Sequence, residues 1–184
     1  MMLLLRRTLV QYNFIELKHT PMKILKKILL ILLIGFILIQ FFRPKKNISA
    51  QTSRNDISTL YAVPGDVKEI LDKACYDCHS NNTKYPWYAE IQPVAWWLDD
   101  HVVEGKSHLN YSEFASYSLR KQYHKLEETE EMIKGKHMPL NSYLWMHKDA
   151  DLSDAERQKL AEWSVGIRKQ MEAKYPIDSL IKKK

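Results

Sequence analysis

Apolar residues recur at helical spacing from about residue 65 to residue 175. The first such stripe follows Pro64 and Gly65 and contains Val67, Ile70, Leu71, Ala74, Cys75 and Cys78. The pattern predicts a second helix over 93–104, ended by Gly105, and a third over about 112–134, ended by Gly135. Because no alternating strand pattern or hairpin signal occurs, the sequence predicts an all-α domain.

The last predicted helix opens with a capping box. Ser153 is followed three residues later by Glu156, and Pro176 ends the pattern. Its predicted inward side chains are Leu160, Trp163, Ile167 and Met171. Between this helix and the preceding one, residues 135–151 are predicted to form a loop that contains Met138 and Pro139.

The N-terminal region has a different pattern. Residues 28–39 are apolar without interruption, with lysines before them and basic residues after them. A basic segment followed by an apolar one is typical of a secretory signal or a signal anchor. We predict an uncleaved membrane anchor over residues 23–42, with cleavage after Ala50 as the alternative.

These patterns divide the chain into five parts. Met22 would make a natural start, so residues 1–22 are interpreted as an upstream extension. The anchor at 23–42 is followed by a polar linker at 43–63, a helical domain at 64–176 and a basic tail at 177–184. With five glycines and seven prolines, the chain has too few turn-forming residues for a turn-rich β-sandwich.

The net charge of +6 is unevenly distributed. Residues 1–50 hold nine Lys or Arg and one acid, while residues 51–184 hold 19 Lys or Arg and 21 acids. The excess basicity therefore lies entirely at the N-terminus. The body has no basic run with interleaved aromatics, so we expect no nucleic-acid partner.

The two cysteines form the motif Cys75-Tyr76-Asp77-Cys78-His79. Cys-x-x-Cys-His is the attachment signature of c-type haem. Two thiols three residues apart near a helix end can reach the two vinyl groups of one porphyrin. The adjacent imidazole of His79 is then predicted to be the proximal iron ligand.

Three other readings of the motif remain open. A thiol oxidoreductase also uses Cys-x-x-Cys, but in a βαβ context that the pattern lacks. A structural zinc site needs further ligands at matching spacing, and none is evident. A plain disulfide is the remaining alternative.

The second axial position is predicted to be filled by Met138. It lies in the loop after Gly135, and Pro139 stiffens the chain behind it. His137 is the rival ligand because it is adjacent and a stronger base. An open or water-ligated site is the third possibility.

The stretch from about residue 65 to 165 resembles the haem-binding domain family of exported bacterial monohaem c-type cytochromes. The resemblance rests on three blocks in order: CYDCHSNNTKYPWYAEIQPVAWWL, HVVEGKSHLNYSEF and GKHMPLNSYLWMHKDADLSDAERQKLAEW. It implies a small cytochrome c-like helical domain around one covalent haem c. It supports haem binding rather than any particular pathway.

Several aromatic and proline residues after the motif are expected to wall the haem. They are Tyr85, Pro86, Trp87, Pro93, Trp96 and Trp97. A haem-ligating histidine usually donates its other ring N–H, and we expect the acceptor for His79 to be a backbone carbonyl near Pro86 or Pro93.

The sequence therefore predicts a single-pass protein of the bacterial inner membrane with its haem domain in the periplasm, where c-type haem is attached. One-electron transfer with unknown redox partner proteins is the favoured function, and an electron carrier is favoured over an enzyme. The alternatives are a haem-based sensor, ligand-binding or catalytic protein with an open distal site, and a haem-free thiol oxidoreductase.

Overall fold

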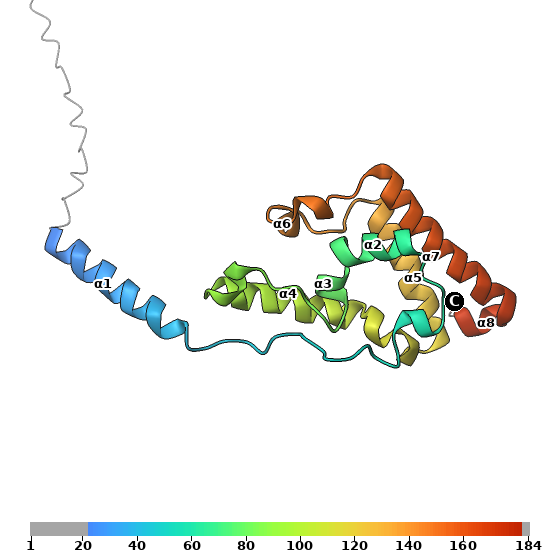
Figure 1. Cartoon of the computed structure of the whole chain (residues 1–184), viewed down its shortest axis with the longest axis horizontal. Coiled ribbons are helices and arrows are strands. Elements are labelled where there is room, and N and C mark those ends of the chain that lie inside the picture. The colour runs from blue at the N-terminus through green and yellow to red at the C-terminus, as the bar shows by residue number, and fades with distance from the viewer. Residues whose placement is uncertain (1–21, 182–184) are drawn as a thin grey trace, which may run out of the picture. The chain divides into compact units, whose positions relative to one another are not determined.

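The computed structural model describes residues 22–181, and every regular element in this range is helical (Figure 1). The all-α prediction is confirmed. The expected upstream extension, apart from Met22, and the last three lysines of the expected tail lie outside the described residues. The chain divides into two compact units, one ending at Phe42 and the other beginning at Arg43.

In the described part of the first unit, residues 22–42, one helix is present, α1 (Met22–Ile39). The segment predicted as a membrane anchor, residues 23–42, is helical as far as Ile39, and its helix contains Lys23, Lys26 and Lys27. Within residues 22–181, no helix combines the length and the apolar character needed to cross a membrane.

The second unit is built around α2 (Gly65–Ala74), α5 (Leu119–Lys134) and α7 (Asp154–Lys174). The apolar faces of these helices share one core, to which Tyr111 and Phe114 of the short helix η3 (Tyr111–Ser116) also belong. The prediction of which α7 side chains face the core is largely confirmed. Three of the four are buried, and the fourth, Trp163, is partly buried against the core.

Two predicted helix boundaries are wrong. Helix α4 (Val94–His108) continues through Gly105 instead of ending there. The predicted helix over 112–134 is two elements, η3 and α5, and Ser118 caps α5 by accepting from the N–H of Lys121.

The C-terminal segment is not simply a tail. Residues 177–180 form α8 (Ile177–Leu180), whose Leu180 is buried in the core. The predicted loop at 135–151 also contains short helices, α6 (Asn141–Leu144) and η4 (Lys148–Ala150). We call residues 135–151 the distal segment.

Residues 43–63, expected as a linker, belong to the second unit and contact it closely. The side-chain amide of Asn47 donates to the Ser80 carbonyl at 2.9 Å and to the Thr83 hydroxyl at 3.0 Å. The backbone N–H of Asn47 donates to the Tyr85 hydroxyl, and Lys106 donates to the Asn47 side chain. This segment therefore straps the loop that follows the cysteine motif.

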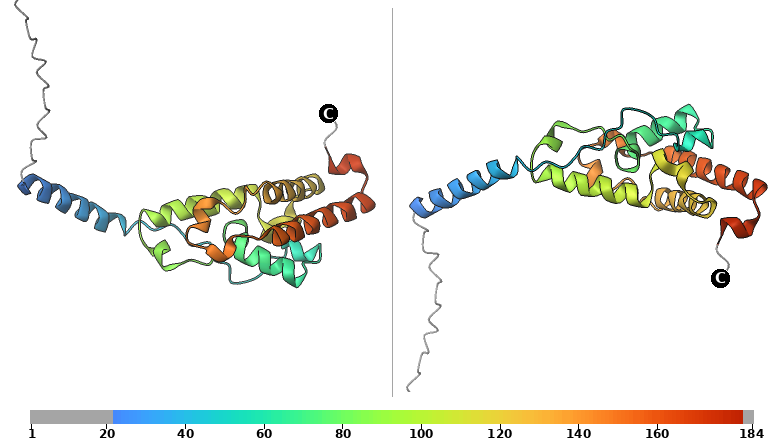
Figure 2. Two further views of the ribbon diagram at one scale, coloured as in Figure 1. Left: turned by 90° about the horizontal axis from the view of Figure 1, so that it is seen from above. Right: turned by 90° about the horizontal axis from the view of Figure 1, so that it is seen from below.

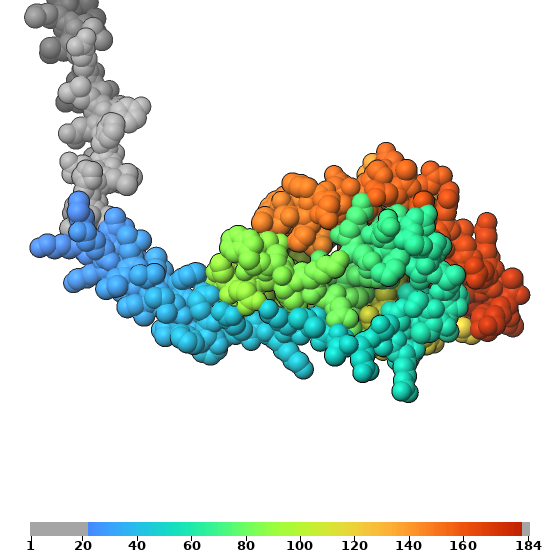
Figure 3. All heavy atoms as spheres, in the orientation of Figure 1, coloured from blue at the N-terminus to red at the C-terminus, as the bar shows by residue number. Residues whose placement is uncertain are grey.

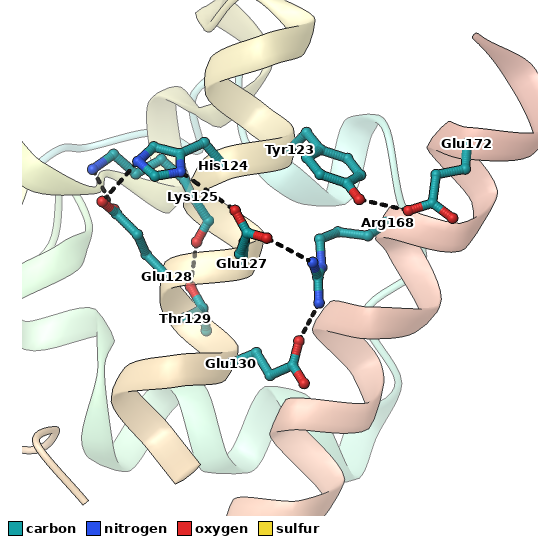
Figure 4. A network of polar contacts seen from close by, with 9 residues as sticks. All are labelled: Tyr123, His124, Lys125, Glu127, Glu128, Thr129, Glu130, Arg168 and Glu172. Carbon is teal, nitrogen blue, oxygen red and sulfur yellow. Dashed lines mark hydrogen bonds and ion pairs between the residues drawn. The ribbon is translucent and has the colours of Figure 1, made fainter. Parts of the chain in front are cut away.

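Helices α5 and α7 pack antiparallel, as Figures 1 and 2 show and as their side-chain pairs confirm. Tyr123 near the start of α5 donates to Glu172 near the end of α7 at 2.5 Å. Further along α5, Glu127 and Glu130 both form ion pairs with Arg168 of α7 (Figure 4). These pairs form a polar edge along the contact between α5 and α7.

The capping box at the start of α7 generates a pH-dependent prediction. The Glu156 carboxylate accepts from Lys73 of α2 at 2.6 Å and from the Ser153 N–H at 2.8 Å. The lysine contact is the main reason that the pKa of Glu156 falls from 4.5 to about 2. A carboxyl with a lowered folded-state pKa stabilises the fold above its unfolded pKa, and this contribution is lost as the pH falls through the folded value.

Glu156→Gln should therefore lower the free energy of unfolding by about 1 kcal/mol at neutral pH. The difference from wild type should shrink between pH 4.5 and about 2, measured by urea denaturation at each pH. Glu131→Gln, at an exposed position on α5, is the control and should show no comparable trend. An equal difference at pH 7 and pH 2 would contradict the prediction.

Candidate haem-binding site

The cysteine motif lies at a break between two helices. Helix α2 ends at Ala74, Cys75 departs from helical geometry with φ −128°, and α3 (Tyr76–His79) carries the rest of the motif. The single continuous helix predicted through Cys78 is thus interrupted at Cys75. Both cysteines are half-buried free thiols on one short segment.

The ring of His79 is held by the end of α4. Its Nδ1 lies 2.9 Å from the backbone carbonyl oxygen of Leu109. A carbonyl can only accept, so Nδ1 carries the hydrogen and Nε2 keeps a free lone pair. Burial lowers the pKa of His79, which keeps the ring neutral, the form that binds a metal.

The acceptor for His79 was expected near Pro86 or Pro93, and that prediction is wrong. Leu109 serves because α4 runs past α3 at very short range, with Gly105 against Cys78. A Cβ on Gly105 would lie 2.7 Å from the Cys78 carbonyl oxygen and 3.0 Å from its Cβ. The absence of a side chain at residue 105 therefore permits the approach that brings Leu109 to His79.

The two thiols are poor nucleophiles in this environment. Burial, reinforced by the neighbouring Cys78, raises the pKa of Cys75 to about 12. Burial and the nearby Asp77 carboxylate raise the pKa of Cys78 to about 11. Disulfide oxidoreductases need the opposite, a lowered thiol pKa. Among residues 22–181, no three His, Cys, Asp or Glu side chains converge as a metal-ion site would require.

The distal segment returns to the cysteine motif. Tyr143 of α6 donates from its hydroxyl to the Asp77 carboxylate at 2.7 Å, and the N–H of Lys84 donates to the other Asp77 oxygen. The Tyr143 ring also stacks on His147, with 4.0 Å between ring centroids. Asp77, a variable position of the motif, thereby connects the motif to the segment that contains Met138.

Met138 is fixed by its backbone on both sides. Its N–H donates to the Met132 carbonyl at the end of α5 at 3.3 Å, and its own carbonyl accepts from Arg157 of α7 at 2.7 Å. The Met138 side chain is partly buried against the core. The rival His137 is exposed, and its ring lies so close to Gly135 that a Cβ there would be 2.7 Å from Cδ2.

The predicted wall residues are mostly exposed. Trp87 and Trp97 are 74% and 46% exposed, and Pro93 is also exposed, whereas Tyr85 is partly buried and binds Asn47. More than half of the large apolar side chains that residues 43–181 expose fall in two short stretches, 87–97 and 140–146. The members of these stretches are Trp87, Ile91, Val94, Trp96, Trp97, Leu140, Trp145 and Met146.

These two stretches flank the motif. The first belongs to η2 (Trp87–Glu90) and α4, which pack on each other and, through α4, on α3. The second belongs to the distal segment, which reaches Asp77 through Tyr143. In Figure 3 they adjoin on one face of the molecule, and the surface is indented between them. Exposed apolar area of this kind marks a ligand or partner site.

Two other surface hollows lie away from the motif. One, of about 620 Å³, runs between α5 and α7 and is lined largely by charged side chains such as Glu130 and Lys169. The other lies beside Tyr61 and Met171. Neither hollow includes a residue of the cysteine motif, so neither alters its interpretation.

Sequence reasoning missed four residues that organise the site: Asn47, Gly105, Leu109 and Arg157. Gly105 was predicted only as a helix end. Arg157 carried a readable signal, because it is in register with Leu160 on the core-facing stripe of α7. The Leu109 contact uses only a backbone carbonyl, which no side-chain pattern reports.

The model of a family described as a haem-binding domain matches residues 34–165, which is more than half of the chain. This match confirms the resemblance inferred from the sequence. No curated protein and no solved structure matches the chain.

The residues present fit a haem. The motif offers two thiols and an imidazole whose Nε2 lone pair is free, and the exposed apolar side chains beside it suit the apolar faces of a porphyrin. Cys75 and Cys78 would hold the porphyrin edge, and His79 would supply the proximal nitrogen.

Gly105 generates a prediction with an internal control. Gly105→Ala should destabilise the protein by about 1–3 kcal/mol, because the new methyl group overlaps the Cys78 backbone. It should also reduce the amount of haem bound per chain. Thermal or urea denaturation and the haem-to-protein absorbance ratio measure the two effects.

The matched control is Gly166→Ala in α7, where nothing lies within 4 Å of an added Cβ. This change should stabilise the helix by about 0.5–1 kcal/mol and leave haem content unchanged. If the two alanine variants behaved alike, the close approach of α4 to Cys78 would not matter for the site.

Proposed function

The chain belongs to the haem-binding domain family, and from this premise we propose that it is a c-type haem protein that transfers single electrons. The observation that carries the proposal is the juxtaposition of Cys75, Cys78 and a His79 ring whose Nδ1–H is engaged by Leu109. When bound, the haem supplies a metal centre that cycles between two oxidation states.

Covalent attachment is supported by the chemistry of the two thiols. They are the two cysteines of the chain, they are unpaired, and they are spaced as the two vinyl groups of a porphyrin require. Their raised pKa values argue against thiol exchange. The haem-free oxidoreductase alternative is thereby disfavoured.

Electron transfer rather than ligand binding follows if Met138 supplies the second axial donor. The backbone of Met138 is held at both its N–H and its carbonyl, while His137 lies exposed against Gly135. A thioether is a soft, neutral ligand that favours the reduced iron. With both axial positions filled by the chain, an external ligand would have to displace Met138.

Export to the periplasm, with α1 as signal or membrane-attachment helix, completes the proposal. Its support is the lysine-flanked apolar run of α1 and the +8 charge of residues 1–50 beside the −2 charge of the remainder. In this proposal the protein binds the inner membrane through α1, and its redox partners bind the haem domain in the periplasm.

Covalent haem is tested by expressing the full chain in a host that matures c-type cytochromes. Acidified acetone should leave the haem on the protein, and intact mass should equal polypeptide plus one haem. Replacing Cys75 and Cys78 together by serine should abolish the adduct. Haem that acid extracts from the wild type would refute covalent attachment, and fractionating the same cells shows whether the product is in the membrane or soluble.

The role of Met138 is tested by carbon monoxide titration of the reduced protein. The wild type should bind carbon monoxide weakly, whereas Met138→Ala should bind it about tenfold or more tightly, because apparent affinity scales with the fraction of open distal sites. The potential of the variant should fall. Met132→Ala, which removes an exposed methionine side chain of α5 outside the two apolar stretches, is the control. Tight binding by the wild type would favour the sensor or ligand-binding alternative.

A further inference from the structure

Among the described residues, Arg157 is the charged side chain that folding buries, with 8% of its surface exposed. It lies on the core-facing stripe of α7, in register with Leu160. A buried charge is costly unless hydrogen bonds compensate for its lost hydration. Its hydrogen-bond partners therefore indicate which part of the structure it stabilises.

Those partners are backbone carbonyls of the distal segment and its two flanks. The guanidinium donates from Nη1 to Met138 at 2.7 Å and to Ile133, at the end of α5, at 3.4 Å. Its Nε donates to Leu152, just before α7, at 3.2 Å. The nearest carboxylate, Asp151, is 3.8 Å away and mostly exposed. One planar side chain thus joins both flanks of the segment to Met138.

We propose that Arg157 is the positioning residue that holds Met138 in place as the second axial ligand, an inference that rests on the proposed function. Fixing the Met138 carbonyl restricts the directions in which the thioether can extend. A planar group with several donors in fixed directions can serve three carbonyls at once, which a lysine ammonium cannot do in the same geometry.

The test compares Arg157→Gln, Arg157→Lys and a matched control in the full haem-loaded chain. The control is Arg168→Gln. This change also removes an arginine from α7, but one that forms ion pairs with Glu127 and Glu130 of α5 instead of hydrogen bonds to Met138 (Figure 4). The readouts are carbon monoxide affinity of the reduced protein, reduction potential, and amide hydrogen exchange over residues 136–152.

Arg157→Gln should raise the apparent carbon monoxide affinity about tenfold or more, lower the potential, and speed exchange in the distal segment. Arg157→Lys should fall between it and the wild type, and it decides the question if Arg157→Gln does not fold. Arg168→Gln should reduce stability while leaving affinity and potential unchanged.

Three results would overturn the proposal. If Met138→Ala opens the iron but both Arg157 variants retain wild-type affinity and potential, Arg157 does not position Met138, and the proposed function stands. If Arg168→Gln opens the iron as much as Arg157→Gln, the effect is general destabilisation. If Met138→Ala behaves as the wild type, Met138 is not a ligand, and the Arg157 proposal fails together with that part of the proposed function.

Discussion

The backbone of α4 lies directly against Cys78 because residue 105 has no side chain, and the geometry of the cysteine motif depends on this contact. The same approach brings the Leu109 carbonyl to 2.9 Å from the His79 ring. An imidazole held in this way presents its Nε2 lone pair in one direction. The cysteine motif is thus organised by a helix that contributes none of its residues.

Residues 135–151 are held by a different part of the scaffold. The antiparallel pair of α5 and α7 sets the two ends of residues 135–151, and Arg157 connects those ends to Met138. The Tyr143–Asp77 hydrogen bond then joins the segment to the motif. The cysteine motif and Met138 are therefore held by different helices, α4 for the motif and α5 and α7 for Met138.

The strap formed by residues 43–49 adds a third support. Asn47 bonds to the carbonyl of Ser80 and to Thr83, and Ser49 donates from its backbone to Asn82, all in the loop directly after His79. Arg43 and Lys46 pair with Glu90 further along the chain. The segment that leaves the N-terminal unit is thus part of the fold that surrounds the motif.

Periodicity and one five-residue motif were enough to predict an all-α haem-binding domain. Helical spacing is a local property, so the existence of α2, α5 and α7 and the Ser153–Glu156 cap could be predicted. Chemistry carried by consecutive residues, such as Cys75, Cys78 and His79, is likewise visible without a structure.

Features that depend on distant segments could not be predicted in this way. Gly105 lies inside α4 and against Cys78, and Leu180 of the expected tail is buried in the core, so both contact segments far away in the chain. The acceptor for His79 was misplaced because backbone carbonyls carry no residue identity. By itself, the sequence determined which groups could bind the haem. Only the tertiary structure decided which carbonyls and helices hold those groups, because that depends on packing between segments that the sequence does not place side by side.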